Sequence, residues 1–323
     1  MASRHGILGI IWDGIRNLSA ESLIPRTLKL GWAYNTEIIG QRYDRQKKTA
    51  IEMAELLARE GISVLVFKGL SMSMYYPVPE HRECGDIDIW LFGQAEKGNR
   101  VAKAAGAKVE KENSKHDIIY FHGVPFENHK ELTSELLNSR NRLINKDLIT
   151  RVKDDRTQPL FATDTLRTPS RVFDELYIPV HAAGHFVVEG ISLRHLCDWA
   201  LIVQANGGFI DMALFDKLRL GQFVRLLNTL CHEWFGIEIP LESRHRNRQL
   251  AARIGADILN YGSSPTTDSR WKLLQLKFRR FFTRKWCYPI VGGNFYLATI
   301  RSSIAHLKSP HDLFKGCLLY TSP

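Results

Sequence analysis

Hydrophobic and polar positions divide the chain into a helical start, a middle rich in short strands and a helical second half. Across residues 39–57 the apolar side chains recur every three to four positions, which predicts an amphipathic helix. Residues 62–67 form an apolar, β-branched run, which is typical of a buried strand. In residues 86–91 polar and apolar residues alternate through Ile89, which predicts a strand with one polar face and one buried face.

The remaining pattern completes an order of helix, α/β block and helical half. A helix is expected at 94–105, followed by strands at 116–121 and 124–127 with a turn at His122 and Gly123. Pro125 has no N–H to donate, so we expect the second of these strands to lie near a sheet edge. Beyond residue 170 the periodicity favours helices at 170–177, 180–186, 192–205, 212–234, 246–259 and 270–282. The expected divisions are an N-terminal helical segment (1–60), an α/β core (61–160) and a helical C-terminal domain (161–323).

Composition narrows the class of protein without naming a function. Hydrophobic residues make up 44% and charged residues 24% of the chain, which excludes wholesale disorder. The net charge of +10 favours acidic partners such as nucleotides, nucleic acid or an anionic membrane, and selects none of them. Five scattered cysteines without a CxxC spacing argue against a disulfide framework or a cysteine zinc site.

No stretch of the sequence has the properties of a membrane anchor. The longest uncharged run, residues 286–300, falls short of the roughly 20 residues that a spanning helix needs, and it contains proline and glycine. The N-terminal apolar patch is followed at once by Asp13 and Arg16, so a signal peptide is not expected. We therefore expect a cytoplasmic protein in a reducing compartment.

The strongest chemical signal is an Asp-Ile-Asp strand that follows a Lys-Gly turn. Asp86 and Asp88 project from the same face of their strand, and adjacent carboxylates repel unless a cation lies between them. A hard ion such as Mg²⁺ suits this pair, although a solvated edge strand shows the same alternation. The turn at Lys68 and Gly69 exposes backbone N–H groups that suit a phosphate. Together these features indicate phosphoryl or nucleotidyl transfer.

Several motifs then resemble one family over roughly residues 50–205. The chain is similar to the uncharacterised nucleotidyltransferases of the polymerase-β-like superfamily. The matching residues are Lys68-Gly69, Tyr76-Pro77, Arg82, Gly85-Asp86-Ile87-Asp88, Phe126-Glu127-Asn128-His129, His181, His185, Arg194 and Asp198. Leu70 stands where the superfamily usually has Gly or Ser.

The resemblance implies an α+β fold: a nucleotidyltransferase-type mixed sheet core with flanking helices, followed by an all-helical C-terminal half. It assigns catalysis and binding of Mg²⁺, with Mn²⁺ as the alternative ion, to Asp86, Asp88 and Glu127. Nucleotide binding is assigned to Lys68, Gly69, Ser71 and Arg82, and the acceptor side to His129, His181, His185, Arg194 and Asp198. The implied reaction transfers a nucleoside monophosphate from an NTP, ATP by superfamily frequency, to an unknown acceptor.

Other interpretations stay open. The acceptor could be a protein, a small molecule or a sugar, with a nucleic acid end less favoured. A degenerate nucleotide-binding module would keep the fold without turnover, and a metal hydrolase on His181, His185 and Asp198 would hold zinc tightly. The plain alternatives are packing for the two histidines, an intrahelical ion pair for Arg194 and Asp198, and a salt bridge from Glu127 to Lys130.

A basic, aromatic segment lies near the C-terminus. Residues 270–286 contain seven Lys or Arg residues among five Trp or Phe residues. We expect a helix that packs its aromatic side chains and exposes its basic face. Peripheral contact with an anionic membrane, or with nucleic acid, is the alternative that we do not favour.

Overall fold

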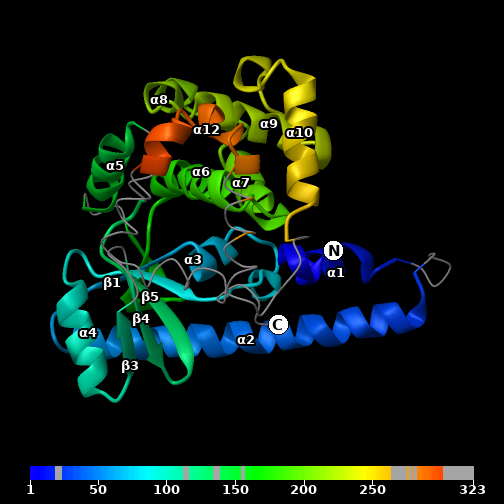
Figure 1. The fold of residues 1–323 in the computed structure, drawn as a ribbon. Helices are drawn as coiled ribbons and strands as arrows, with labels where there is room; N and C mark the ends of the chain where they lie inside the picture. Colours follow the sequence, from blue (N-terminus) through cyan, green and yellow to red (C-terminus); the bar gives the residue numbers. More distant parts are fainter. Residues whose placement is uncertain are drawn as a thin grey trace. The chain divides into compact units, whose positions relative to one another are not determined.

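The computed structural model describes residues 1–18, 24–111, 116–133, 139–153, 157–262, 275, 279 and 282–300. The chain divides into two compact units (Figure 1). Unit 1 comprises Met1–Leu132 and Leu148–Glu175, and unit 2 comprises Thr133–Asp147 and Leu176–Pro323. The domain boundaries expected from the sequence, near residues 60 and 160, stay a prediction.

Unit 1 contains a mixed sheet with the strand order β3-β4-β5-β2-β1-β7-β6. The strands are β1 (Val64–Phe67), β2 (Ile87–Trp90), β3 (Lys108–Lys111), β4 (His116–Phe121), β5 (Val124–His129), β6 (Gln158–Leu160) and β7 (Thr163–Thr168). The pairs β1–β7 and β2–β5 are parallel, and the other neighbours are antiparallel. The predicted mixed sheet core is therefore confirmed.

One face of this sheet is the hydrophobic core of unit 1. Ile87 and Ile89 of β2 and Phe126 of β5 pack in one buried cluster with Met53 and Leu57 of helix α2 (Arg26–Ala58). Helix α4 (Ala95–Ala104) adds to the same cluster, and Figure 1 shows α2 lying along the sheet. Side chains alternate between the two faces of a strand. The residues next to Ile87 and Ile89 in β2, and next to Phe126 in β5, therefore project from the opposite face of the sheet.

The remaining helices flank the sheet or build unit 2. Unit 1 also contains α1 (Leu8–Ile15) and the short α3 (Gly69–Ser73). Helix α5 (Asn141–Lys153) and helix α6 (Arg171–Val188) each belong partly to both units. Unit 2 continues with α7 (Leu193–Ala205), α8 (Met212–Lys217), α9 (Gly221–Phe235), α10 (Arg248–Leu259) and α12 (Cys287–Ile290). The predicted helical C-terminal half is confirmed for the part of the chain that the structure describes.

The expected edge position of the strand that contains Pro125 is wrong. Strand β5 lies inside the sheet, paired with β4 on one side and β2 on the other. Pairing with β2 begins only at Phe126, opposite Ile87, so Pro125 precedes that ladder. Its missing N–H therefore removes no hydrogen bond to β2, and the interior strand tolerates the proline.

Helix boundaries in the second half differ from the prediction at two places. The helix expected at 212–234 is broken into α8 and α9 around Arg219, which has a positive φ of 60°. The helices expected at 170–177 and 180–186 form a single helix, α6, with Pro179 inside it. Side-chain periodicity continued across Arg219, so it did not report the break there, whereas the division expected at Pro179 does not interrupt the helix.

Two further expectations concern the surface and the cysteines. No helix in the described part of the chain is long and apolar enough to cross a membrane. The four cysteines in that part, Cys84, Cys197, Cys231 and Cys287, are free thiols. Most of the basic segment 270–286 lies outside the described residues, and so do residues 316–323.

Candidate active site

The turn between β1 and α3 carries the first group of candidate residues. Lys68 has φ 58° and ψ −144°, a backbone conformation that costs a non-glycine residue of order 1–3 kcal/mol. Gly69 begins α3, and a Cβ at Gly69 would lie 3.4 Å from the carbonyl oxygen of Asp86. The strained turn therefore brings the Lys68 side chain and the start of the Asp-Ile-Asp strand close together.

Strand pairing places two of the predicted acids side by side. In the parallel pair of β2 and β5, Asp88 lies opposite Glu127. Both project from the face of the sheet opposite the α2 core, because Ile87, Ile89 and Phe126 point into that core.

Asp86 precedes Asp88 by two positions, and its carboxyl group hydrogen-bonds Glu127. The structure thus brings the three acids together.

Two cations contact these acids. Asp88, which is 3% exposed, accepts hydrogen bonds at Oδ1 from Lys68 Nζ at 2.5 Å and from His129 Nε2 at 2.8 Å. His129 Nε2 also lies 3.3 Å from Glu127 Oε2, and its Nδ1 lies 3.3 Å from the carbonyl oxygen of Glu131. Both ring nitrogens of His129 therefore face acceptors, as a protonated imidazole requires. We call Asp86, Asp88, Glu127, Lys68 and His129 the carboxylate cluster.

The pKa values of the cluster follow from these contacts. Burial and the adjacent charges of Asp88 and Glu127 raise the pKa of Asp86 well above its usual range. Burial alone would raise the pKa of Glu127, but the hydrogen bond from His129 and the charge of Lys68 hold it far below its usual range. Burial would lower the pKa of His129, yet its hydrogen bonds to Asp88 and Glu127 keep it above the usual value.

The acids of the cluster are consequently in direct contact with cations. The raised pKa of Asp86 favours a proton on its carboxyl group, which hydrogen-bonds Glu127. Lys68 and His129 supply two positive charges within hydrogen-bonding distance. Three carboxyl groups that meet at one point are hard oxygen donors, the ligand type that Mg²⁺ prefers. The donor set therefore fits a divalent ion, which would replace the proton and the cations.

Two predicted nucleotide-binding residues are held by contacts within unit 1. Arg82 is 5% exposed, and its Nη1 donates to the carbonyl oxygen of Gly69 at 3.1 Å. Ser71 is 2% exposed, and its hydroxyl lies 2.6 Å from the hydroxyl of Thr168 in β7. Arg82 thus braces the turn and Ser71 joins α3 to β7, and their predicted contact with a triphosphate stays a prediction.

The predicted acceptor-side residues fall into two places. His129 belongs to the carboxylate cluster in unit 1. His181 and His185 lie on α6, and Arg194 and Asp198 lie on α7, all four in unit 2. The two histidines are half-buried, and Asp198 is 6% exposed. Their assignment to the acceptor side stays a prediction.

Sequence reasoning missed two histidines. His116 of β4 lies opposite His129, and its Nε2 is 3.8 Å from Glu127 Oε1. The predicted hairpin turn at His122 and Gly123 would have identified it, because equal spacing from a two-residue turn pairs 116 with 129. His195 of α7 lies near His181 and His185, with ring centroids 5.8 and 5.1 Å away, and nothing in its local pattern marks it.

The chain is similar to a known protein family and, at low identity, to two solved structures. A family model described as uncharacterised nucleotidyltransferase matches residues 1–236. The solution structure of the antibiotic-resistance factor ANT(2'')-Ia has 12% identity and a TM-score of 0.37, covering 50% of this chain and 85% of that one. The crystal structure of ANT(2'')-Ia in complex with adenylyl-2''-tobramycin has 11% identity and a TM-score of 0.35, covering 57% and 94%. No curated protein matches the chain.

Proposed function

The chain belongs to the family of uncharacterised nucleotidyltransferases, and from this premise we propose that it transfers a nucleoside monophosphate from an NTP, most simply ATP, to an acceptor. The observation that carries the proposal is the meeting of Asp86, Asp88 and Glu127 on one face of the sheet beside Lys68. A packing role does not explain three acids at one point, because their mutual repulsion costs free energy that Lys68, His129 and a retained proton have to offset in the metal-free protein. A divalent ion, Mg²⁺ or Mn²⁺, offsets it directly.

The residues of the carboxylate cluster would have different roles. Asp86, Asp88 and Glu127 would hold the ion, which when bound neutralises charge on the leaving pyrophosphate and lowers the pKa of the attacking group. Lys68, displaced from Asp88 by the ion, would turn to the phosphate oxygens as a point charge. His129 is hydrogen-bonded to both Asp88 and Glu127, so it would orient these carboxylates.

Glu127 is also the candidate general base for the acceptor. Its contacts with His129 and Lys68 hold its pKa far below the usual range of a carboxyl group, so it would become a stronger base only when these cations turn away from it. The acceptor classes that this proposal allows are a protein hydroxyl, a small molecule and a sugar. The acceptor-side roles of His181, His185, Arg194 and Asp198 remain part of the proposal, as does a cytoplasmic location.

The test is transfer from each α-labelled NTP, with Mg²⁺ and a cell extract as the source of acceptor. We expect labelled product with the wild-type chain, and about a hundredfold less, or lower still, with Asp86→Asn or Asp88→Asn, because removing one group that supports stabilisation of transition-state charge typically costs that much. Asp164→Asn is the matched control, because Asp164 is an exposed aspartate on strand β7 of the same sheet.

Three outcomes separate the alternatives. Loss of transfer in Asp86→Asn and Asp88→Asn, but not in Asp164→Asn, supports the proposal. Mg²⁺-dependent NTP binding without any labelled product would indicate a degenerate binding module instead. Wild-type activity in both Asp86→Asn and Asp88→Asn would exclude the carboxylate cluster as the active site.

A further inference from the structure

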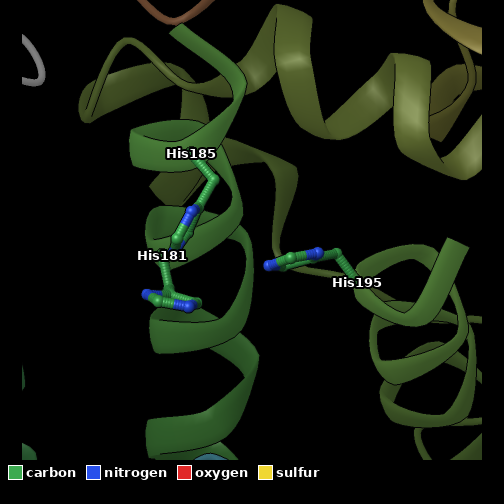
Figure 2. A group of neighbouring side chains, drawn as sticks. All are labelled: His181, His185 and His195. Carbon is green, nitrogen blue, oxygen red and sulfur yellow. The ribbon is translucent and has the colours of Figure 1, made fainter. Parts of the chain in front are cut away.

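Unit 2 contains a cluster of three histidines, two of which the proposed function assigns to the acceptor side. His181 and His185 lie one turn apart on α6, and His195 points toward them from α7 (Figure 2). One ring nitrogen from each of the three residues lies within 4.8 Å of the others. We call these residues the histidine cluster.

The spacing of the three rings matches a metal site. A tetrahedral ion with Zn–N bonds of about 2.0–2.1 Å places its imidazole nitrogens about 3.4 Å apart and the ring centres roughly 5 Å apart. The ring centroids in the histidine cluster are 4.5, 5.1 and 5.8 Å apart. The rings therefore already have the mutual distances of bound ligands, and small side-chain rotations would bring the nitrogens onto one ion.

The outer hydrogen bond of the His185 ring is that of a metal ligand, and the Ser192 hydroxyl lies where it could accept one from His195. His185 Nδ1 lies 2.6 Å from the Glu189 carboxylate, and His195 Nδ1 lies 2.9 Å from the Ser192 hydroxyl. A histidine that binds a metal through one nitrogen usually donates the other N–H to such a group, which fixes the ring and raises its basicity. With the proton on Nδ1, Nε2 is the nitrogen whose lone pair points to the ion.

The local structure restricts the positions of the His195 and His181 rings. His195 is the third residue of α7 and completes a capping box with Ser192, so its ring is held at the start of that helix. In the capping box the Ser192 N–H also approaches Nδ1, at 3.2 Å. An ion at Nε2 would require a proton on Nδ1, which would then donate to the Ser192 hydroxyl in place of accepting from the Ser192 N–H, so binding has to break that half of the capping box. The Tyr177 ring stacks on His181, with centroids 5.9 Å apart, and limits the rotation of that ligand.

We propose that His181, His185 and His195 bind one zinc ion or a similar divalent transition metal. Three neutral imidazoles suit borderline-soft ions and are poor ligands for Mg²⁺, so this site is chemically distinct from the carboxylate cluster. Three protein ligands leave a fourth position open to water or to a donor atom of a substrate. The proposal differs from the acceptor-side prediction for His181 and His185, since it gives both residues a metal as their partner.

The test uses the tag-free, full-length chain, stripped with a chelator and titrated with Zn²⁺ and with Co²⁺. We expect one tightly bound Zn²⁺ per chain by elemental analysis after dialysis, and the intense visible bands of four-coordinate Co²⁺. His185→Gln and His195→Gln should each abolish retention of the ion after dialysis. Glu189→Gln, which leaves all three ligands in place, should weaken binding about tenfold or more. Because Glu189→Gln changes none of the ligands, it still tests the site if His185→Gln or His195→Gln folds poorly.

Two controls separate this site from its rivals. His232, half-buried on α9 in the same unit, is a matched histidine outside the cluster, so His232→Gln should bind zinc as the wild type does. His116, Glu127 and His129 of unit 1 also place ligand atoms within 4.8 Å of one another. Loss of zinc in His116→Gln but not in His185→Gln would move the ion to that site and overturn the proposal. A stripped wild-type chain that retains no Zn²⁺ would overturn it as well.

Discussion

At the scale of single residues, the carboxylate cluster works as a balanced set of charges. Asp88 contacts Lys68 and His129, and the raised pKa of Asp86 favours a proton that it shares with Glu127. This arrangement stabilises buried acids in the absence of a metal, because each remaining negative charge has a cation within hydrogen-bonding distance. It also means that an incoming ion has to displace a proton.

We therefore expect Mg²⁺ binding to release about one proton per ion and to tighten as the pH rises toward the raised pKa of Asp86. Titration calorimetry in two buffers of different ionisation enthalpy measures the released proton directly. Asp86→Asn should abolish the release. Binding with full affinity and no proton release in the wild type would show that Asp86 is already ionised.

The raised pKa of Asp86 also determines how the stability of the metal-free protein changes with pH. Between the usual pKa of an aspartate and the raised one, the unfolded chain has lost this proton and the folded chain has kept it. Asp86 therefore reduces the stability of the metal-free protein as the pH rises across that window. Because the asparagine has no charge to bury, metal-free Asp86→Asn should melt at the wild-type temperature or higher at neutral pH.

At the scale of elements, one arginine joins three segments of unit 2. Arg284 donates from Nε and Nη2 to the carbonyl oxygen of Phe186 near the end of α6, and from Nη1 and Nη2 to Asp257 on α10. Its side chain is only 10% exposed. Hydrogen bonds to a buried charged group contribute more than neutral ones, and their loss leaves acceptors unpaired.

We expect Arg284→Met to lower the free energy of unfolding by about 3 kcal/mol, since it leaves a partly buried carboxylate without its cation. Arg248→Met on the exposed surface of α10 is the matched control and should change stability by less than about 0.5 kcal/mol. Urea unfolding followed by circular dichroism measures both variants. Equal midpoints would show that the contacts of Arg284 contribute nothing net.

Elements with long, regular patterns were predictable from the sequence, and short polar ones were not. The helix expected at 192–205 is α7, and the amphipathic stretch 39–57 lies within α2. Strand β3 was missed because its residues are Lys-Val-Glu-Lys, with two exposed positions and no apolar alternation to detect. Such an edge strand forms because β4 offers backbone partners, which is information from a distant part of the chain.

The same distinction applies to the candidate site. Asp86 and Asp88 were found because both lie on one strand, where spacing alone puts them on one face. Glu127 was found only through the family resemblance, and its place opposite Asp88 depends on the register of two strands far apart in sequence. His195 joins His181 and His185 through helix packing, which no local spacing encodes.

At the scale of the whole molecule, two sites of opposite chemistry lie in different units. The carboxylate cluster in unit 1 offers oxygen donors to a hard ion, while the histidine cluster in unit 2 offers nitrogen donors to a softer one. The net charge of +10 favours the approach of a polyanionic NTP at long range, an attraction that salt screens. Each ligand should therefore stabilise its own unit.

Hydrogen exchange tests this division in the intact chain. A non-hydrolysable NTP with Mg²⁺ should slow exchange in β1, α3, β2 and β5, whereas Zn²⁺ should slow it in the part of α6 within unit 2 and in the first turns of α7. A ligand that binds only the native state raises the free energy of opening of the segments that it contacts, by about 2.7 kcal/mol at a hundredfold excess over its dissociation constant. His195→Gln should remove the zinc effect and keep the nucleotide effect, and Asp88→Asn should do the reverse. Protection of β5 by Zn²⁺ would place the zinc ion on His116, Glu127 and His129 instead.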